Sequence, residues 1–187
     1  MSTREPSSDR LARARALWRF VGDERPAFAL QPGPGQESVW DYPRPPRLMP
    51  DAREVVVRFG GIEIARSSRA LRLLETASPP TFYLPAADVR TELLERAGGS
   101  SHCEWKGEAG YWSVVVEGRR LDAAAWSYDA PHAEYRALLG HVAFYPQQLD
   151  CRVDGERVRP QPGRFYAGWI TSELVGPFKG ESGSGGW

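Results

Sequence analysis

The chain has 187 residues, which is enough for one well-packed domain with extensions. Its 24 basic and 24 acidic residues give a formal net charge of +0 at pH 7. This balance argues against a nucleic-acid-binding protein that relies on a broad basic surface. No apolar run approaches the roughly 20 residues of a membrane-spanning helix. We therefore expect neither a nucleic acid nor a membrane as a partner.

The cysteines and histidines indicate the compartment and the metal content. The two cysteines are Cys103 and Cys151, and the polar start MSTREPSSDR lacks a secretory signal. Both features favour a cytoplasmic protein with reduced thiols. His102, His132 and His141 form no C-x-x-C or H-x-x-x-H spacing with the cysteines or with one another. We therefore predict neither a metal site nor a cofactor.

The first 38 residues read as an extension. Apolar residues at helical spacing predict a short helix over 7–20, and prolines and glycines predict a loop over 22–38. Further along, two β-branched runs around Gly60–Gly61 predict a hairpin over 54–66. The other predicted elements up to residue 99 are an aromatic strand fragment over 39–46, a helix or strand over 68–76, a strand over 81–85, and a helix over 86–97 that ends at Gly98–Gly99.

The second half is dominated by short strands. They are predicted over 111–118, 123–131, 141–146, 150–158 with a turn at Asp154–Gly155, and 165–175, with a helical turn over 132–139. Many strands and few helices predict a mainly β (α+β) fold of short antiparallel strands. We expect a core domain over 39–175, between the extension 1–38 and a glycine-rich C-terminal segment over 176–187.

Lysine is confined to two similar hexapeptides. Lys106 lies in WKGEAG (105–110) and Lys179 in FKGESG (178–183), while every other basic residue is arginine. Lysine differs from arginine because its pKa falls on burial and its amine can act as a nucleophile. Lys106 is therefore a candidate for amine chemistry or anion binding. The alternative is an ammonium that forms an ion pair with Glu75 or Glu104.

The hexapeptides belong to a longer repeat. A W-x-Y-x-x-P phrase, a two-stranded turn, a Phe-Tyr phrase and an aromatic-Lys-Gly-Glu loop occur twice in the same order. The first set is at 39–45, 55–65, 81–83 and 105–112, and the second is at 125–131, 150–158, 164–166 and 178–187. This order indicates an internal duplication that would place the two lysine loops in related positions. Chance similarity among short, biased phrases is the alternative.

Two further side chains could take part in chemistry beside Lys106. Cys103 lies three residues earlier, and a nearby ammonium lowers a thiol pKa. Glu75 lies among apolar residues, where burial would raise its pKa and suit it to acid–base work. The structural alternatives are a buried, inert thiol and an ion pair between Glu75 and Lys106 or an arginine.

Aromatic residues follow several neighbouring predicted strands. Such side chains usually form the core, but a set of them can also wall a cage for a planar or cationic ligand. The candidates for such a cage are Tyr83, Tyr111, Trp112, Trp126, Tyr128 and Tyr145.

Several of these phrases together resemble the family described as domain of unknown function 427, whose members are sometimes labelled nucleotidyltransferase-like. The resemblance covers roughly 53–156, and VWDYPRPP and FYAGWITSELVGPFKG resemble segments of longer members. It implies a small β-tent domain similar to methionine sulfoxide reductase B and Mss4-like proteins, although this chain lacks their paired C-x-x-C ligands. The family phrase C-x-[WY]-K-G-x-A-x-Y matches Cys103, Trp105, Lys106, Gly107, Ala109 and Tyr111. Its Glu-Thr phrase matches Glu75 and Thr76, and its W-S-Y phrase matches Trp126 and Tyr128.

The leading hypothesis is a small-molecule enzyme or ligand-binding protein. Two alternatives remain open: a non-catalytic binding module with an aromatic cage, and nucleotidyltransferase-like activity. A homo-oligomer held by the glycine-rich segment is a further expectation. The predicted catalytic residues are Lys106, Cys103 and Glu75, and the predicted ligand-binding residues are Tyr83, Trp105, Gly107, Tyr111, Trp126, Tyr128 and Lys179.

Overall fold

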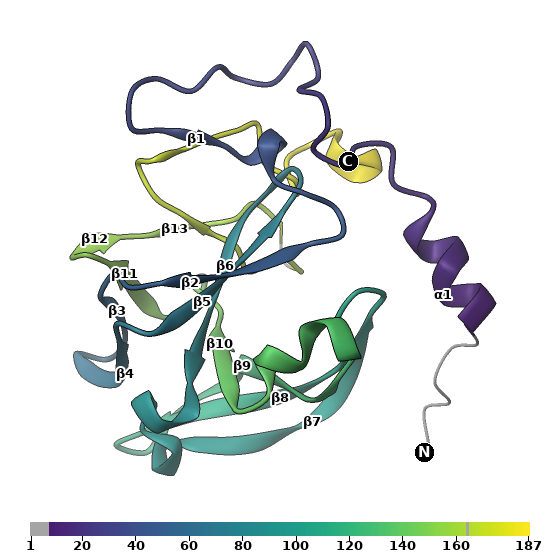
Figure 1. The fold of residues 1–187 in the computed structure, drawn as a ribbon. Helices are drawn as coiled ribbons and strands as arrows, with labels where there is room; N and C mark the ends of the chain where they lie inside the picture. The colour runs from purple at the N-terminus through teal and green to yellow at the C-terminus, as the bar shows by residue number, and fades with distance from the viewer. Residues whose placement is uncertain (1–7, 164) are drawn as a thin grey trace.

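The computed structural model describes residues 8–163 and 165–187, and over these residues the chain is mainly β-sheet (Figure 1). This confirms the predicted fold class. None of the helices in the described ranges has the length and apolar character needed to cross a membrane. The helices are α1 (Ser8–Arg15) and the short 3-10 helices η1 (Val39–Asp41), η2 (Ala86–Asp88), η3 (Thr91–Leu93), η4 (Ala133–Leu138) and η5 (Ser184–Gly186).

The larger sheet has seven strands, and every neighbouring pair in it is antiparallel. Its longest strands form consecutive hairpins at the bottom of Figure 1. Across the sheet, the strands are β2 (Arg47–Asp51), β5 (Ala70–Glu75), β6 (Ser78–Pro85), β10 (His141–Phe144), β9 (Arg119–Pro131), β8 (Gly107–Val116) and β7 (Leu94–Cys103).

A second sheet of four strands consists of two hairpins joined edge to edge. Gly60 and Gly61 have φ of 59° and 85°, and Asp154 and Gly155 have φ of 46° and 80°. Positive φ at both turn residues matches the right-handed twist of a hairpin, so both predicted turns are confirmed. The strands, in order, are β12 (Glu156–Arg157), β11 (Asp150–Val153), β3 (Val55–Phe59) and β4 (Ile62–Ser67).

The main hydrophobic core lies between these two sheets. The small sheet contributes residues such as Val57 and Ile64, and the large sheet contributes Phe82 and Phe144, all of them fully buried. Trp169 packs in the same core and donates its indole N–H to the Phe144 carbonyl at 3.1 Å. Each such side chain contributes about 1.5–3 kcal/mol by leaving water, so this core supplies much of the driving force for folding.

The large sheet carries a second, more aromatic cluster on its other face. Along β6, Phe82 and Leu84 point into the main core, whereas Tyr83 joins the second cluster. This follows from the two-residue period of a strand. Trp126 and Tyr128 of β9 and Trp105 also belong to the second cluster. Polar aromatic residues are therefore concentrated on one face of the sheet.

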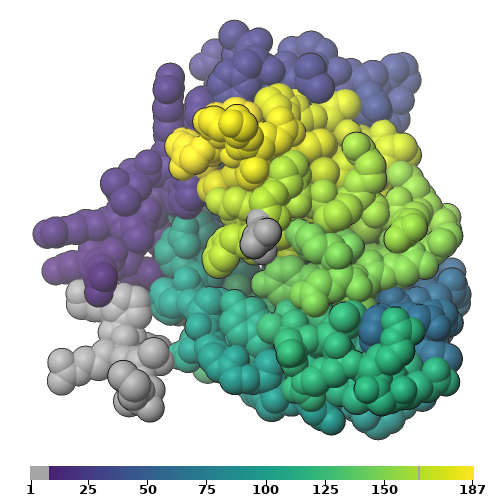
Figure 2. Space-filling model, turned by 180° about the vertical axis from the view of Figure 1, so that it is seen from behind, coloured from purple at the N-terminus to yellow at the C-terminus, as the bar shows by residue number. Residues whose placement is uncertain are grey.

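The two ends of the chain pack against each other. A parallel bridge pairs β1 (Glu37–Ser38) with β15 (Leu174–Val175), next to an antiparallel pair of β13 (Arg159–Pro160) and β14 (Trp169–Ile170). The C-terminal Trp187 stacks on Phe28 at 5.2 Å between ring centroids and meets Trp40 edge-on at 5.1 Å. Figures 1 and 2 both show the yellow C-terminal segment beside the purple and blue N-terminal one.

The helix predicted over 86–97 is wrong. The chain makes the two short helices η2 and η3 and then enters β7, which contains Gly98 and Gly99. The Arg90 amide donates to the Ile64 carbonyl at 2.8 Å, and Leu94 pairs with Val114 of β8. Pairing with two other strands therefore overrides an apolar spacing that fits a helix only locally.

Other element predictions need smaller corrections. The segment 68–76 is the strand β5, and the helical turn over 132–139 is confirmed as η4. Helix α1 ends at Arg15 rather than at residue 20. Instead of the long strand predicted over 165–175, the chain forms only the two-residue strands β14 and β15.

The repeated phrases do not all fold alike. Residues 39–41 form η1 instead of a strand fragment, whereas 125–131 lie in β9. The two repeated hairpins do pair with each other, through β3 and β11. Residues 1–7 of the predicted extension and Arg164 of the repeated Phe-Tyr phrase lie outside the described residues.

Candidate functional site

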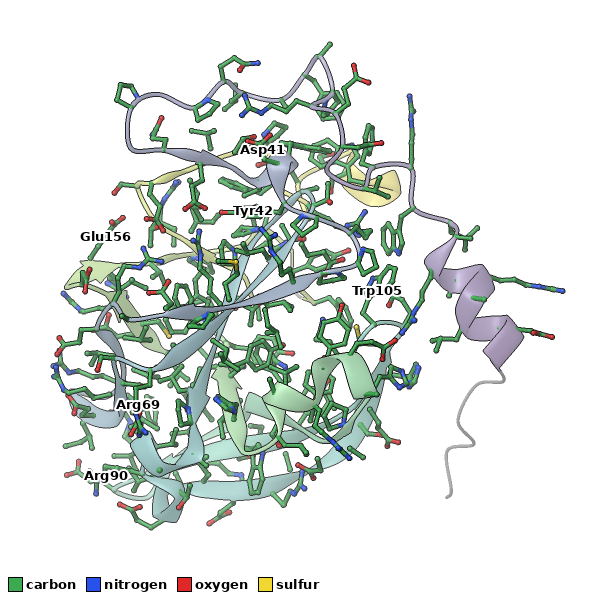
Figure 3. The ribbon with its side chains drawn as sticks, viewed as in Figure 1. Asp41, Tyr42, Arg69, Arg90, Trp105 and Glu156 are labelled. Carbon is green, nitrogen blue, oxygen red and sulfur yellow. The ribbon has the colours of Figure 1, made fainter. Side chains whose placement is uncertain are left out.

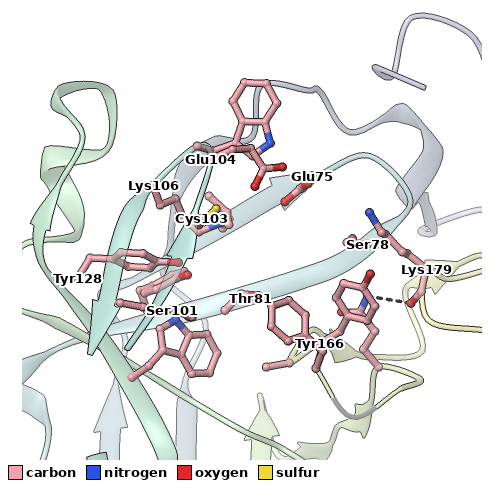
Figure 4. Close-up of a pocket in the computed structure, with 18 of the residues that line it drawn as sticks. Glu75, Ser78, Thr81, Ser101, Cys103, Glu104, Lys106, Tyr128, Tyr166 and Lys179 are labelled. Carbon is pink, nitrogen blue, oxygen red and sulfur yellow. Dashed lines mark hydrogen bonds between the residues drawn. The ribbon is translucent and has the colours of Figure 1, made fainter. Parts of the chain in front are cut away.

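A pocket of about 300 Å³ lies on the aromatic face of the large sheet. Strands β5, β6, β8 and β9 and the end of β7 form its floor and one side. The segment after α1 and the C-terminal part of the chain contribute the remaining walls, through Trp18, Gln161, Tyr166 and Lys179. Figure 4 shows Tyr166 and Lys179 together on one side of the pocket. The pocket is therefore built from parts of the chain that are distant in sequence.

The structure brings together almost all of the side chains predicted for the site. Gly107 and Trp112 are the exceptions, because they do not line the pocket. The predicted residues that do line it are Glu75, Tyr83, Cys103, Trp105, Lys106, Tyr111, Trp126, Tyr128, Tyr145 and Lys179.

Gly107 acts on the backbone instead. It has a φ of 101°, and a Cβ atom at this position would lie 3.2 Å from the Ala130 carbonyl oxygen. The carbonyl of Lys106 accepts a hydrogen bond from the His132 amide at 3.0 Å. A residue without a Cβ is required for this turn, which places Lys106 at the start of β8.

The second lysine precedes a glycine of the same conformation. Gly180 has a φ of 103°, and a Cβ there would lie 2.0 Å from the Pro162 carbonyl oxygen. The Lys179 amide donates to the Ala77 carbonyl at 2.7 Å, and its carbonyl accepts from the Gln161 side chain at 2.9 Å. The Lys-Gly pairs of both hexapeptides thus present a lysine to one pocket from a similar tight turn.

Lys106 is the deeply placed cation of the pocket. The residue is 7% exposed, and its ammonium nitrogen lies 6.0 Å from the centre of the Tyr128 ring. Burial opposes its charge, but the acidic side chains around it, led by Tyr128 and Cys103, outweigh burial and raise the pKa of Lys106 well above its ordinary value. Lys106 therefore stays protonated at neutral pH.

Lys179 lies in a different electrostatic environment. Its ammonium nitrogen lies 3.7 Å from the centre of the Trp18 ring and 5.7 Å from that of Tyr166. Burial, helped by the like charge of Arg44 and opposed by Glu75 and Glu104, lowers the pKa of Lys179 to about 8. About a fifth of this amine is consequently neutral near physiological pH.

The two carboxylates near the lysines have other partners. The Arg44 guanidinium, whose side chain is 1% exposed, contacts Glu75 at 3.3 Å. The Trp18 indole donates to the carboxylate of Glu104 at 3.1 Å. Within the described part of the chain, neither Lys106 nor Lys179 forms an ion pair with a carboxylate. The sequence-based alternative of an ion pair from Lys106 to Glu75 or Glu104 is therefore wrong, and an arginine pairs with Glu75.

The aromatic wall supplies hydrogen-bond donors as well as apolar surface. Tyr83 and Tyr128 are nearly fully buried, and burial raises the pKa of both phenols. The buried indole nitrogen of Trp105 has no hydrogen-bond partner in the described structure. Trp105 lies at the tip of the β7–β8 hairpin, on the side of α1 (Figure 3). A ligand could therefore find protonated donors on several sides.

The thiols and histidines differ in their surroundings. Cys103 is a free, half-buried thiol in the pocket lining, whereas Cys151 is buried in the main core, where burial raises its thiol pKa well above the ordinary value. His102 and His132 lie with ring centroids 5.9 Å apart. In the described residues no hydrogen bond joins Cys103 to a histidine.

Some of the residues that line the pocket were not predicted from the sequence. Trp18 appeared only as one apolar position of a helix, and Tyr166 only as part of a repeated phrase. The recurrence of the Phe-Tyr phrase was the available signal for Tyr166, since its first copy contains Tyr83. The missed side chains with polar atoms in the lining include Trp18, Ser78, Thr81, Ser101, Gln161 and Tyr166.

The fold and pocket define a mainly β domain with a lysine-bearing, aromatic-walled cavity. A family model described as Domain of unknown function (DUF427) matches residues 47–158, which is more than half of the chain. The chain belongs to this family, as the sequence resemblance implied. No curated protein matches the chain. The matched range contains Glu75, Cys103 and Lys106, whereas Trp18 and Lys179 lie outside it.

Proposed function

We propose that this pocket binds a small molecule that combines a planar ring with a negatively charged group. The observation that carries this proposal is the buried ammonium of Lys106, which has no carboxylate partner in the described structure. Burial removes water from this ammonium, and an anionic ligand would replace the lost solvation. The aromatic walls suit a ring beside this charge.

The donor set favours binding of an organic anion over nucleotidyl transfer. Transfer of a nucleotidyl group uses carboxylates that are free to hold divalent cations. Here Glu75 is engaged by Arg44, and Glu104 is engaged by Trp18. No cluster of three or more metal-binding side chains occurs in the described residues. We further propose a cytoplasmic location, which the two free thiols support.

A thermal-shift screen with matched ligands tests this function. Small aromatic carboxylates such as 4-(hydroxymethyl)benzoate are compared with the corresponding neutral alcohols, such as benzyl alcohol. Ligand at 100 times its Kd stabilises the folded protein by about 2.7 kcal/mol, which gives a measurable rise in Tm. We expect the carboxylates to raise Tm and the alcohols to have little effect.

Charge variants assign the effect to the pocket. Lys106→Met removes the ammonium and keeps most of the stem, so it should abolish the shift caused by the carboxylates. Arg136→Met removes an exposed positive charge from η4 and should leave the shift unchanged. The proposal fails when no aromatic carboxylate stabilises the wild-type protein, or when the shift persists in Lys106→Met.

A further inference from the structure

We propose that Lys179 is a nucleophilic amine that forms an imine with an aldehyde or ketone group on the ligand of this pocket. This inference rests on the proposed function, because it names the chemical class of the bound molecule. It also assigns different work to the two lysines: Lys106 holds the anionic group, and Lys179 reacts with the carbonyl carbon.

The backbone on both sides of Lys179 is held in place. Its amide and carbonyl bond to Ala77 and Gln161, and Gly180 is pressed against the Pro162 carbonyl. Figure 4 shows the side chain extending from the C-terminal segment toward Glu75 and Ser78. This fixed loop therefore positions the Lys179 amine in the pocket. A group that reacts repeatedly in one geometry needs such positioning.

The groups that face the Lys179 amine do not hold it in a salt bridge. The cations and acids nearby are Arg44 before β2, Glu75 of β5, Glu104 of the β7–β8 turn and Tyr166. Glu75 and Glu104 are engaged by Arg44 and Trp18, as described above. Within the described residues the amine therefore contacts aromatic faces, which leaves its nitrogen available to attack.

The protonation states of the two lysines support this division. Lys179 has a pKa of about 8, so roughly half of its amine is neutral at pH 8. Lys106 has a raised pKa and remains an ammonium. Pairs of titratable groups driven apart by their surroundings commonly mark an acid and a base, or a nucleophile, of one site.

The reaction balances without any oxidant or reductant. The neutral amine adds to the carbonyl carbon, so that a C–N bond forms while the carbonyl π bond breaks and the oxygen takes up a proton. The carbinolamine takes up a second proton on this oxygen and loses it as water, and the nitrogen then gives up its remaining proton to solvent or to a pocket base. Glu75 lies on the same side of the pocket and could exchange these protons.

The chain offers a sharp labelling experiment because it has only two lysines. The full-length protein is treated at pH 8 with formaldehyde and cyanoborohydride, which converts each transient imine into a stable methylamine, and mass spectrometry of peptides gives the rate at each amine. An ordinary lysine is less than about 1% neutral at this pH. We expect Lys179 to react more than tenfold faster than Lys106. Equal rates at the two lysines would overturn the inference.

A second arm uses 4-carboxybenzaldehyde, which carries the ring, the anion and the carbonyl together. Its reaction at Lys179 should saturate with concentration and should be competed by 4-(hydroxymethyl)benzoate, the analogue without a carbonyl. Lys106→Met should remove the saturation, and Lys179→Arg should remove the adduct.

The two arms separate failure of the inference from failure of the proposed function. Binding of 4-(hydroxymethyl)benzoate without faster reaction at Lys179 overturns the imine proposal and supports ligand binding. Faster reaction of Lys179 with formaldehyde but no saturation with the aromatic aldehyde overturns anion recognition by Lys106. Circular dichroism of each variant confirms that a lost signal does not reflect unfolding.

Discussion

The two lysines illustrate how neighbouring side chains set the chemistry of a residue. Both are nearly buried, at 7% and 5% exposure, and both precede a glycine with φ near 100°. Lys106 has acidic phenol and thiol groups around it, whereas Lys179 has an indole face and the charge of Arg44. The same residue type in the same backbone turn is therefore a permanent cation in one place and a titrating amine in the other.

The lowered pKa of Lys179 predicts a pH-dependent stability. The unfolded chain keeps this lysine protonated up to about pH 10.4, whereas the folded chain loses the proton near pH 8. Between these values the unfolded state binds more protons, so the free energy of unfolding rises with pH. Measured relative to Lys179→Met by urea unfolding, wild-type stability should increase by on the order of 2 kcal/mol from pH 7.5 to 10. A constant difference across this range would contradict the assignment.

The backbone of Gly107 gives a second prediction. An alanine would have to adopt a φ of 101° and place its Cβ 3.2 Å from the Ala130 oxygen. We expect Gly107→Ala to lower the free energy of unfolding by about 1–3 kcal/mol and to weaken ligand binding, because it displaces Lys106. Gly98→Ala, in the partner strand β7, meets no atom within 4 Å and is the matched control. Equal unfolding midpoints for the two variants would show that the turn tolerates a side chain.

At the scale of elements, Arg44 joins the N-terminal segment to the end of β5. Its guanidinium donates to the Phe20 carbonyl at 2.9 Å and to the Thr76 carbonyl at 2.9 Å, and it pairs with Glu75. Its side chain is 1% exposed, so this ion pair is shielded from water and salt. Arg44 also contacts Trp18, whose ring centre lies 4.1 Å from the guanidinium carbon.

Arg44→Met should therefore be costly. Removal of one partner leaves Glu75 and two carbonyls without their donor, and we expect a loss of about 3–5 kcal/mol in the free energy of unfolding. The control is Arg69→Met, which breaks an ion pair with Asp88 that is exposed at the surface (Figure 3). Such pairs contribute about 0–1 kcal/mol. Chemical denaturation at low and high salt distinguishes the two, since only the Arg69 pair should respond to salt.

The sequence predicted elements well where local and tertiary signals agree. The glycine turn at 60–61 and the strands predicted over 111–118 and 123–131 were correct, because β-branched or aromatic runs bounded by turn residues favour strands. The helix over 86–97 was wrong, because pairing with β4 and β8 decides the conformation of those residues. No local pattern in one sequence reports such partners.

The residues of the candidate site could be predicted from the sequence, but the contacts that these residues make could not. Family phrases and the rarity of lysine indicated Lys106, Cys103 and Glu75, and these residues line one pocket. That Arg44 pairs with Glu75, and that Trp18 covers Lys179, depends on contacts across 31 and more residues. These contacts, rather than residue type, determine which lysine is the weaker base.

At the scale of the whole molecule, both ends of the chain complete a pocket whose floor belongs to the family domain. The matched range 47–158 contains all strands of both principal sheets. The end segments add Trp18, Gln161, Tyr166 and Lys179 to the pocket. In this chain, therefore, the environment proposed for the reactive amine depends on segments outside the family range.

The packing of the two ends against each other leads to a final prediction. Trp187 contacts Phe28 and Trp40 of the same chain, so the glycine-rich segment is anchored internally. Trp187→Ala should remove about 1–3 kcal/mol of packing, which lowers the Tm by roughly 2–10 °C for a chain of this size. It should also speed the exchange of water into the pocket, because Lys179 lies on the same segment.

The control for this variant is Phe165→Ala, since Phe165 is 74% exposed and its removal should leave Tm within about 1 °C. Light scattering after gel filtration gives the second readout. Because the tail packs on its own chain, the molar mass of the Trp187→Ala variant should equal that of the wild type, whatever that mass is. A fall in molar mass would mean that the tail holds two chains together in solution, as expected for the homo-oligomer considered from the sequence. A fall in Tm without a change in mass would assign the segment to completing the pocket of its own chain.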